Sequence, residues 1–401
     1  MTRVLYGETL GCHPGVRWRR AAARSRLGHA AFALLIGTSA VAAAPSSGGS
    51  DYLKRHYDFG GPAAPAVAAS AAPKWLPIPR AAGRITRKQL GLVINTADPY
   101  SVEVGEFYIR ARGLSPRQVL RVQLPVRPAL TPEEFKAFAA QVDGFFGAPV
   151  QALALAWTYP YAVACNSITG ALALGHDAAL CARSCAPSLR SPYFNNPSTE
   201  PHSRLKLRPS MLLAARDVAM AKAMIQRGVA ADGSLGLRGA TPAHAWFVAT
   251  GDTARGVRQP LFPPPGLLRR IGVEVHVAAA PATDNAHRVL LYETGAVSVP
   301  KLDTIKWVPG AIADHLTSFG GVLEGGHGQM SILDWIASGA TASYGTVSEP
   351  CAHPQKFPHP QILLLNYLQG ASAIEAYWRS VAWPQQGVFI GEPLAAPFAR
   401  P

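Results

Sequence analysis

The residues best suited to chemistry lie between Asp314 and Gly321, where an apolar run ends in Asp, His, Thr and Ser before two glycines. Parallel α/β sheets carry reactive groups at the carboxyl ends of their strands, and this stretch has that position. In a strand, Asp314 and His315 would point to opposite faces. Ser318 would have to turn back to give its proton to His315. The stretch therefore predicts a hydrolytic site of Asp314, His315 and Ser318, or polar groups that only hydrogen-bond the loops above.

A second possible site combines His327 with Cys351. His327 stands between two glycines after one expected strand, and Cys351 follows the next strand. In a cysteine peptidase, an imidazole in such a position activates the thiol or acts as an acid toward the leaving group. The alternative is that His327 is a loop residue and Cys351 is one half of a disulfide.

A proline-rich segment between Pro350 and Pro360 carries polar side chains that could bind a ligand beside a sheet end. A rigid, solvated cover over the sheet would explain the same composition. The candidate binding residues in and before this segment are Thr317, Tyr344, Glu349, His353 and His359.

Four of the five cysteines lie beyond the N-terminal region, and four thiols allow three pairings. We expect Cys181 to pair with Cys185 as a tight loop clip, with Cys165 and Cys351 either free or paired. A zinc site that adds His176 to Cys181 and Cys185 fits no known zinc module well. The sequence therefore predicts no metal site.

The elements that position these residues follow an N-terminal export signal. A basic stretch at 17–26 leads into an apolar run at 30–36 and then into small residues at 40–44. These are the three parts of a secretory signal, which we expect to be residues 1–44, cleaved near Ala42-Ala43. The apolar run is shorter than the roughly 20 residues of a membrane span. The sequence thus predicts a periplasmic or extracellular protein with no span after signal removal.

The composition limits the class of protein further. The chain has 401 residues, 48% of them hydrophobic and 15% charged, and a net charge of +14, which excludes wholesale disorder and a coiled coil. The basic residues are scattered and are not interleaved with aromatics, so we expect no nucleic-acid partner. No Walker loop, dinucleotide fingerprint, G-x-S-x-G elbow or H-E-x-x-H motif occurs, so we expect no cofactor. An unknown protein or peptide is the expected partner, and the oligomeric state is open.

The remainder divides into a disordered Ala/Pro/Gly-rich linker at 45–83 and a single α/β domain at 84–398, with a cysteine-bearing insertion at about 160–208. Apolar runs predict strands near 90–95, 119–122, 152–157, 245–249, 272–277, 289–292, 310–315, 340–344 and 387–390. Helical patterns predict helices near 98–112, 132–143, 213–230, 328–337, 358–368 and 371–380. This alternation predicts a mainly parallel, Rossmann-like sheet with helices on both faces.

Several blocks of the chain resemble an uncharacterised family of exported bacterial proteins. The blocks are residues 92–104, 313–321, 340–351 and 390–394. More distantly, the order of elements resembles gingipain-type cysteine peptidases of the caspase fold. The helix at 369–376 and the strand at 389–394 are similar to the end of that fold, and 339–345 resembles its late strand.

The gingipain-type resemblance implies a three-layer α/β sandwich and the position of a peptidase site. It places residues 291–296 where such peptidases carry His-Gly, and 316–319 where they carry the nucleophilic Cys. Both catalytic residue types are missing from those positions. Without a thiolate and an imidazole, that mechanism cannot run. The resemblance therefore implies a degenerate relative that binds a partner or peptide without cleavage, with hydrolysis through Asp314, His315 and Ser318 as the alternative.

Overall fold

The computed structural model describes residues 74–284 and 286–400. The chain divides into two units, residues 1–69 and 70–401, and the described residues all belong to the second unit. The expected signal peptide, and the expected linker as far as residue 73, lie outside the described residues.

A mostly parallel sheet of 11 strands forms the centre of the described domain, as expected from the sequence. Its strands in chain order are β1 (Leu90–Asn95), β2 (Val119–Val122), β4 (Ala152–Leu155), β7 (Ser210–Leu212), β8 (Ala243–Ala249), β9 (Gly266–Leu268), β10 (Val273–Ala279), β11 (Val289–Thr294), β12 (Trp307–His315), β13 (Ala342–Thr346) and β14 (Gly387–Gly391). The spatial order is β2-β1-β4-β7-β14-β13-β12-β11-β8-β10-β9. A small second sheet contains β3 (Ala129–Leu130), β5 (Ala162–Val163) and β6 (Asn166–Ser167).

The sheet consists of two groups of parallel strands. β2, β1, β4 and β7 form one group, and β13, β12, β11, β8 and β10 form the other. β14 lies between the groups, antiparallel to β13 and joined to β7 through Ile390 and Leu212. The central strands are buried along their whole length, which is why their sequences are continuous apolar runs.

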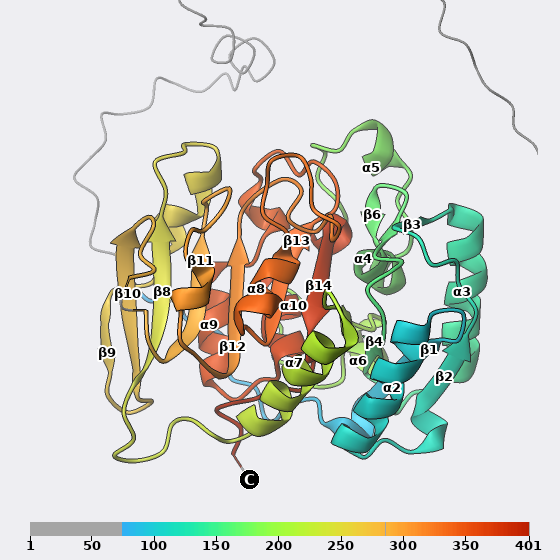
Figure 1. The fold of residues 1–401 in the computed structure, drawn as a ribbon, viewed down its shortest axis with the longest axis horizontal. Coiled ribbons are helices and arrows are strands. Elements are labelled where there is room, and N and C mark those ends of the chain that lie inside the picture. Colours follow the sequence, from blue (N-terminus) through green and yellow to red (C-terminus); the bar gives the residue numbers. More distant parts are fainter. Residues whose placement is uncertain (1–73, 285, 401) are drawn as a thin grey trace, which may run out of the picture. The chain divides into compact units, whose positions relative to one another are not determined.

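Helices cover both faces of this sheet. The main ones are α2 (Pro99–Arg112), α3 (Pro132–Phe145), α7 (Val218–Ala231), α8 (Ile332–Ser338), α9 (Pro360–Leu368) and α10 (Ala373–Ser380). Figure 1 shows α2, α7 and α8 in front of the sheet and α9 and α10 behind it. The fold is therefore the expected α/β class with three layers.

Further helices complete the domain. They are α4 (Ile168–Leu174), α5 (Ala179–Ala182) and α6 (Pro201–Leu205), with the 3-10 helices η1 (Arg87–Gln89), η2 (Pro116–Gln118), η3 (Arg255–Leu261), η4 (Leu302–Thr304), η5 (Pro354–Lys356) and η6 (Pro384–Gln386).

Local capping residues fix where the main helices begin. The side chain of Thr131 accepts a hydrogen bond from the backbone of Glu134, and Pro132 occupies the first position of α3 as expected. The helix expected over 213–230 begins only at Val218, where the side chain of Asp217 provides the N-cap. The expected start was wrong because the buried strand β7 ends at Leu212 and residues 213–217 form the loop that leads from it to the helix, and a short apolar run does not distinguish these elements.

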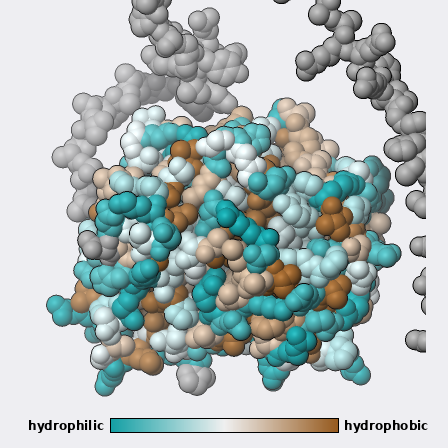
Figure 2. All heavy atoms as spheres, in the orientation of Figure 1, coloured by the Kyte–Doolittle hydropathy of each residue, from teal (hydrophilic) through white to brown (hydrophobic). Residues whose placement is uncertain are grey.

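The segment at 74–85, most of it within the expected linker, forms neither helix nor strand and lies along α9 and α10. Three of its backbone N–H groups donate to side chains of those helices, at Gln361, Gln369 and Glu375. None of the described helices is long and apolar enough to cross a membrane. On the face shown in Figure 2, hydrophilic and hydrophobic residues are interspersed.

Candidate functional site

The carboxyl ends of β11 and β12 carry a buried cluster of charges. Glu293 and Asp314 lie side by side in the register of the two strands. Both share one guanidinium, because Nη1 of Arg258 in η3 lies 2.6 Å from Glu293 Oε1 and 2.7 Å from Asp314 Oδ1. Burial raises the pKa of both carboxyl groups, most strongly that of Glu293, although Arg258 opposes the shift. One guanidinium can balance only one carboxylate, so burial favours the protonated form of the second carboxyl group.

His315 points to the opposite face of the sheet and is fully buried. Its Nδ1 accepts a hydrogen bond from Trp335 Nε1 at 2.9 Å, and its Nε2 donates to the carbonyl of Met330 at 2.9 Å. Burial lowers the pKa of His315 to about 4. Both ring nitrogens are therefore occupied, and the neutral imidazole has no lone pair left to act as a base.

Ser318 lies just beyond the end of β12 and is half-buried. Its carbonyl accepts a hydrogen bond from Thr346 Oγ1 at 2.9 Å. Among the described residues, no hydrogen bond joins Ser318 to His315, and Asp314 lies on the other face with Arg258. The three residues of the expected hydrolytic site therefore occupy one strand end without forming a relay.

The four described cysteines form two disulfides, and neither is the expected Cys181–Cys185 pair. Cys165 bonds to Cys181, and Cys185 bonds to Cys351. The expected pairing was wrong because the fold brings a distant cysteine to each end of this short loop. Since Cys351 has no free thiol, the expected cysteine peptidase of His327 and Cys351 is excluded in this form.

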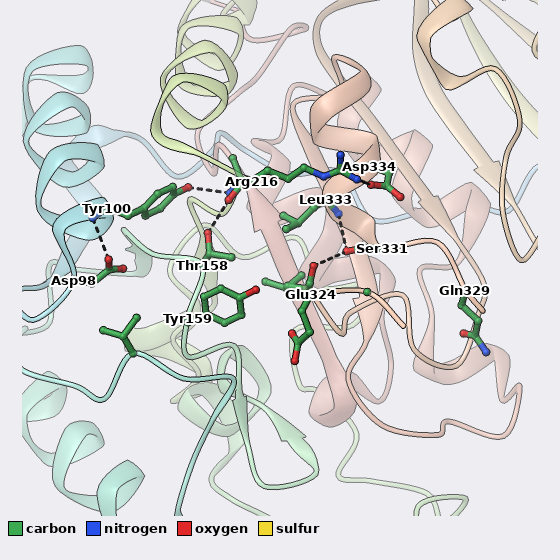
Figure 3. Close-up of a pocket in the computed structure, with 14 residues that line it drawn as sticks. Asp98, Tyr100, Thr158, Tyr159, Arg216, Glu324, Gln329, Ser331, Leu333 and Asp334 are labelled. Carbon is green, nitrogen blue, oxygen red and sulfur yellow. Dashed lines mark hydrogen bonds and ion pairs between the residues drawn. The ribbon is translucent and has the colours of Figure 1, made fainter. Parts of the chain in front are cut away.

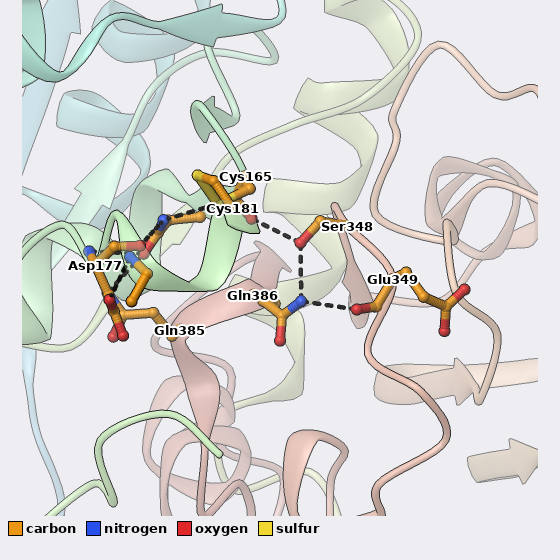
Figure 4. The surroundings of a disulfide bond; sticks show 9 residues. Cys165, Asp177, Cys181, Ser348, Glu349, Gln385 and Gln386 are labelled. Carbon is orange, nitrogen blue, oxygen red and sulfur yellow. Dashed lines mark hydrogen bonds between the residues drawn. A yellow bond between two sulfur atoms is a disulfide. The ribbon is translucent and has the colours of Figure 1, made fainter. Parts of the chain in front are cut away.

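The surroundings of the first disulfide tie the insertion to the central sheet. Asn166 and Asp177 exchange two hydrogen bonds, at 3.0 and 3.1 Å, which close the loop that brings Cys165 to Cys181. Ser348, after β13, donates to the carbonyl of Cys165 at 2.6 Å (Figure 4). The insertion is thus fixed to the loop that follows β13.

Three of the expected binding residues make internal hydrogen bonds. Thr317 donates to the side-chain oxygen of Gln329, and buried Tyr344 donates to the carbonyl of Lys356. Glu349 Oε1 accepts the backbone N–H two residues further on, at 2.7 Å. These contacts hold the loops over the strand ends in place.

The histidines of this region lie apart from one another. His359 lines a cavity of about 460 Å³ that also includes Trp383, and the ring of His353 lies 5.9 Å from that of Trp383. Burial lowers the pKa of both histidines. His327 is exposed and stacks on Phe319 at 4.2 Å.

The loops that follow β1, β4, β7 and β12 meet around a cavity of about 610 Å³. We call it the strand-end pocket. Its polar and aromatic lining residues are Asp98, Tyr100, Thr158, Tyr159, Arg216, Glu324, Gln329, Ser331 and Asp334. The chain contributes to this pocket from segments more than 200 residues apart, and Glu324 and Gln329 belong to the loop that follows β12 (Figure 3).

A network of hydrogen bonds fixes one wall of the strand-end pocket. The hydroxyl of Tyr100, at the start of α2, donates to the carbonyl of Leu213 and accepts from the backbone of Ala215, both at 2.9 Å. Thr158 donates to the carbonyl of Ala215 at 2.9 Å. The loops after β4 and β7 are therefore joined to the first turn of α2.

The charges in the pocket are mainly negative. Arg216 pairs with Asp334 across the pocket, which leaves Asp98 and Glu324 without a cationic partner among the described residues. Burial raises the pKa of Asp98, against the effect of backbone hydrogen bonds from Tyr100 and the next residue. Burial and then the nearby Glu324 raise the pKa of Tyr159. The pocket thus offers two carboxylates beside an aromatic ring.

Sequence reasoning missed the pocket residues, although a signal was present. Asp98 and Thr158 follow directly after buried strands, which is where open α/β sheets place ligands. Glu324 carries no such signal, because it lies in a long loop whose path depends on Gln329 and on the strand ends below it.

No protein-family model and no curated protein matches the chain. The solved structures that are similar to it include the following two. One is the crystal structure of the Arg-specific cysteine proteinase gingipain R, at 10% identity and a TM-score of 0.43, covering 77% of this chain and 78% of that one. The other is the complex of the Porphyromonas gingivalis RgpB pro- and mature domains, at 9% identity and a TM-score of 0.40, covering 76% and 79%. Both similarities are distant, and at these identities and TM-scores they assign no family and no residue role to this chain.

Proposed function

We propose that this chain is an exported binding domain that holds a basic peptide side chain in the strand-end pocket and does not cleave the peptide. The observation that carries the proposal is the pair of carboxylates, Asp98 and Glu324, that no described cation neutralises. A guanidinium or ammonium group would form charge-assisted hydrogen bonds with them and would pack its aliphatic stem on Tyr159.

The strand ends beside the pocket support binding without cleavage. All four described cysteines are in disulfides and have no free thiol, and both ring nitrogens of His315 form hydrogen bonds. Ser318 has no hydrogen bond to a general base among the described residues. A serine hydroxyl without such a base is a weak nucleophile.

The disulfides also fit an oxidising compartment outside the cytoplasm. The export signal expected at residues 1–44 would deliver the chain to such a compartment. Mass measurement of the protein secreted by a bacterial host tests this proposal, and an N-terminus at Met1 would contradict it.

The binding experiment uses labelled pentapeptides with alanine at every position but the central one, which is Arg or its neutral isostere citrulline. Fluorescence anisotropy with the full chain measures both affinities. We expect the Arg peptide to bind about 10-fold or more tightly than the citrulline peptide, as one charged hydrogen bond is worth about 1.5–3 kcal/mol.

Glu324→Gln should weaken Arg-peptide binding about 10-fold and leave citrulline-peptide binding unchanged. Glu133→Gln, at an exposed carboxylate on α3 outside the pocket, is the matched control and should change neither affinity. Equal affinity for the two peptides would refute the binding site. Peptide cleavage that Ser318→Ala abolishes would instead establish the hydrolase.

A further inference from the structure

A group of histidines lies away from the strand-end pocket, at the first residues of β8 and β10. These two strands are parallel neighbours, and their register places His244 beside Glu274 and Trp246 beside His276. Side chains two residues apart on a strand share a face. His244, Glu274 and His276 therefore project from the same side of the sheet.

The donor atoms of these three side chains converge on one point. His244 Nδ1 lies 2.9 Å from His276 Nε2 and 3.7 Å from Glu274 Oε2, and His276 Nε2 lies 4.0 Å from the same carboxylate oxygen. Ligands about 2.1 Å from a tetrahedral Zn²⁺ are about 3.4 Å apart. The observed spacing brackets this value, so a small outward movement of one imidazole would admit an ion.

Two imidazole nitrogens at 2.9 Å can form only one hydrogen bond, with one nitrogen as donor and the other as acceptor. The imidazole that accepts this hydrogen bond must be neutral, which is the form that binds metals. Glu274 supplies a negative charge, which suits a divalent cation.

The surrounding residues orient the ligands. Trp246 stacks on His276 with ring centroids 4.3 Å apart, and the ring of His287 lies 4.9 Å from that of His244. The nearby Arg288, which would repel a cation, directs its guanidinium to the carbonyls of Thr241 and Pro242. The stacking of Trp246 fixes the orientation of His276, and the hydrogen bonds of Arg288 keep its charge away from the ligands. Both features favour a preorganised metal site.

We propose that His244, Glu274 and His276 form a binding site for a divalent transition metal of the zinc class, with solvent in the fourth position. Two imidazoles and one carboxylate are a donor set that zinc uses. The side chains of the two histidines are 13% and 26% exposed, so an ion can reach them from solvent. The metal would join β10, the second strand from one edge of the sheet, to its neighbour β8 (Figure 1).

The test is a titration of the chelator-washed full chain with Zn²⁺ alone, in which calorimetry measures the heat of binding. We expect one equivalent to bind, and a Zn²⁺-dependent rise in the melting temperature, because an ion bound only to the native state stabilises it. Co²⁺ in place of Zn²⁺ should give the visible absorption of a four-coordinate site with nitrogen and oxygen ligands.

His244→Ala and His276→Ala should each weaken this binding at least 10-fold and remove the rise in melting temperature. Glu274→Gln, which keeps the shape of the side chain, should also weaken it and guards against misfolding of the alanine variants. His327→Ala is the matched control, because it removes an exposed histidine outside the cluster and should leave binding unchanged. Zn²⁺ binding that survives His244→Ala and Glu274→Gln, or no stoichiometric binding at all, would overturn the proposal.

Discussion

Glu293, Asp314 and Arg258 show how burial decides the state of a single residue. Apart from Arg258, no hydrogen-bond donor among the described residues reaches the four carboxylate oxygens. Two ionised carboxylates around one guanidinium would leave an uncompensated buried charge, so the pKa of Glu293 is raised. The native cluster therefore binds a proton more strongly than the same carboxyl groups do in the unfolded chain.

This proton predicts how Glu293→Gln changes the pH dependence of stability. A carboxyl group with a raised pKa binds more protons in the native state than in the unfolded state, so its contribution to stability falls as the pH rises above about 4.5. The neutral Gln variant does not lose stability in this way. The difference in unfolding free energy between the variant and the wild type should therefore shift in favour of the variant from pH 4 to pH 7. Urea unfolding at both values measures the difference, and Glu133→Gln should show none. A difference that shrinks with rising pH would mean that Glu293 is ionised.

Arg258→Met tests the same cluster from its cationic side. The substitution leaves two buried carboxyl groups without a cation, and breaking a buried pair in this way costs about 3–5 kcal/mol. We expect the free energy of unfolding in urea at pH 7 to fall by this amount, and Glu293→Gln in the same background to restore part of it. An unchanged free energy would show that the ion pairs contribute nothing.

At the scale of elements, the disulfides fix the irregular insertion onto the regular sheet. The Cys165–Cys181 bond closes a loop of 16 residues within the insertion, whereas the Cys185–Cys351 bond spans 166 residues and reaches the loop after β13. The longer closure restricts the unfolded chain more strongly. The second bond is therefore expected to contribute more to stability.

Replacing each pair by serine should separate the two contributions. Loop-closure entropy predicts losses of about 3 kcal/mol for Cys165 and Cys181 and about 5 kcal/mol for Cys185 and Cys351. Denaturant unfolding of both double variants measures the losses, and far-UV circular dichroism should show the sheet intact. A larger loss for the shorter loop would show that native contacts around Cys165, rather than chain entropy, dominate.

At the scale of the whole molecule, a buried carboxylate connects the first and last parts of the described chain. Glu392, directly after β14, accepts hydrogen bonds from Tyr108 at 2.6 Å and from Arg112 at 2.5 and 3.0 Å. A Cβ at Gly228 of α7 would approach Glu392 to 2.5 Å, so α7 packs directly over it. Helices of both halves of the sequence therefore depend on one side chain.

Glu392→Ala should weaken the domain as a whole. It leaves the buried guanidinium of Arg112 with only Asp232, and Tyr108 without its acceptor, at a cost of about 3–5 kcal/mol. Asp232→Asn, at the more exposed partner, should cost about 1 kcal/mol or less. Urea unfolding followed by tryptophan fluorescence and circular dichroism should give coincident transitions. Separate transitions would show that the two halves fold independently.

Much of the fold could be predicted from the sequence because its signals are local. Thr131 and Pro132 mark the start of a helix through contacts within its first turn. The run at 90–95 is mostly apolar because that strand is buried on both faces of the sheet. The signal was ambiguous at 210–215, where an apolar run covers both a strand and the loop that leads to the helix beginning at Val218. Only its place beside β4 makes residues 210–212 a strand.

The sequence by itself determined the α/β class, the candidate strand end at Asp314 and His315, and the absence of a cysteine and histidine at residues 291–296 and 316–319. Only the tertiary structure decided the disulfide partners, the two faces on which Asp314 and His315 lie, the strand-end pocket and the group around His244. Capping and strand burial act between neighbours along the chain. Disulfides, pockets and metal-ligand sets depend on distances between segments that lie as far apart in the sequence as Cys185 and Cys351. The order of the strands in the sheet sets these distances.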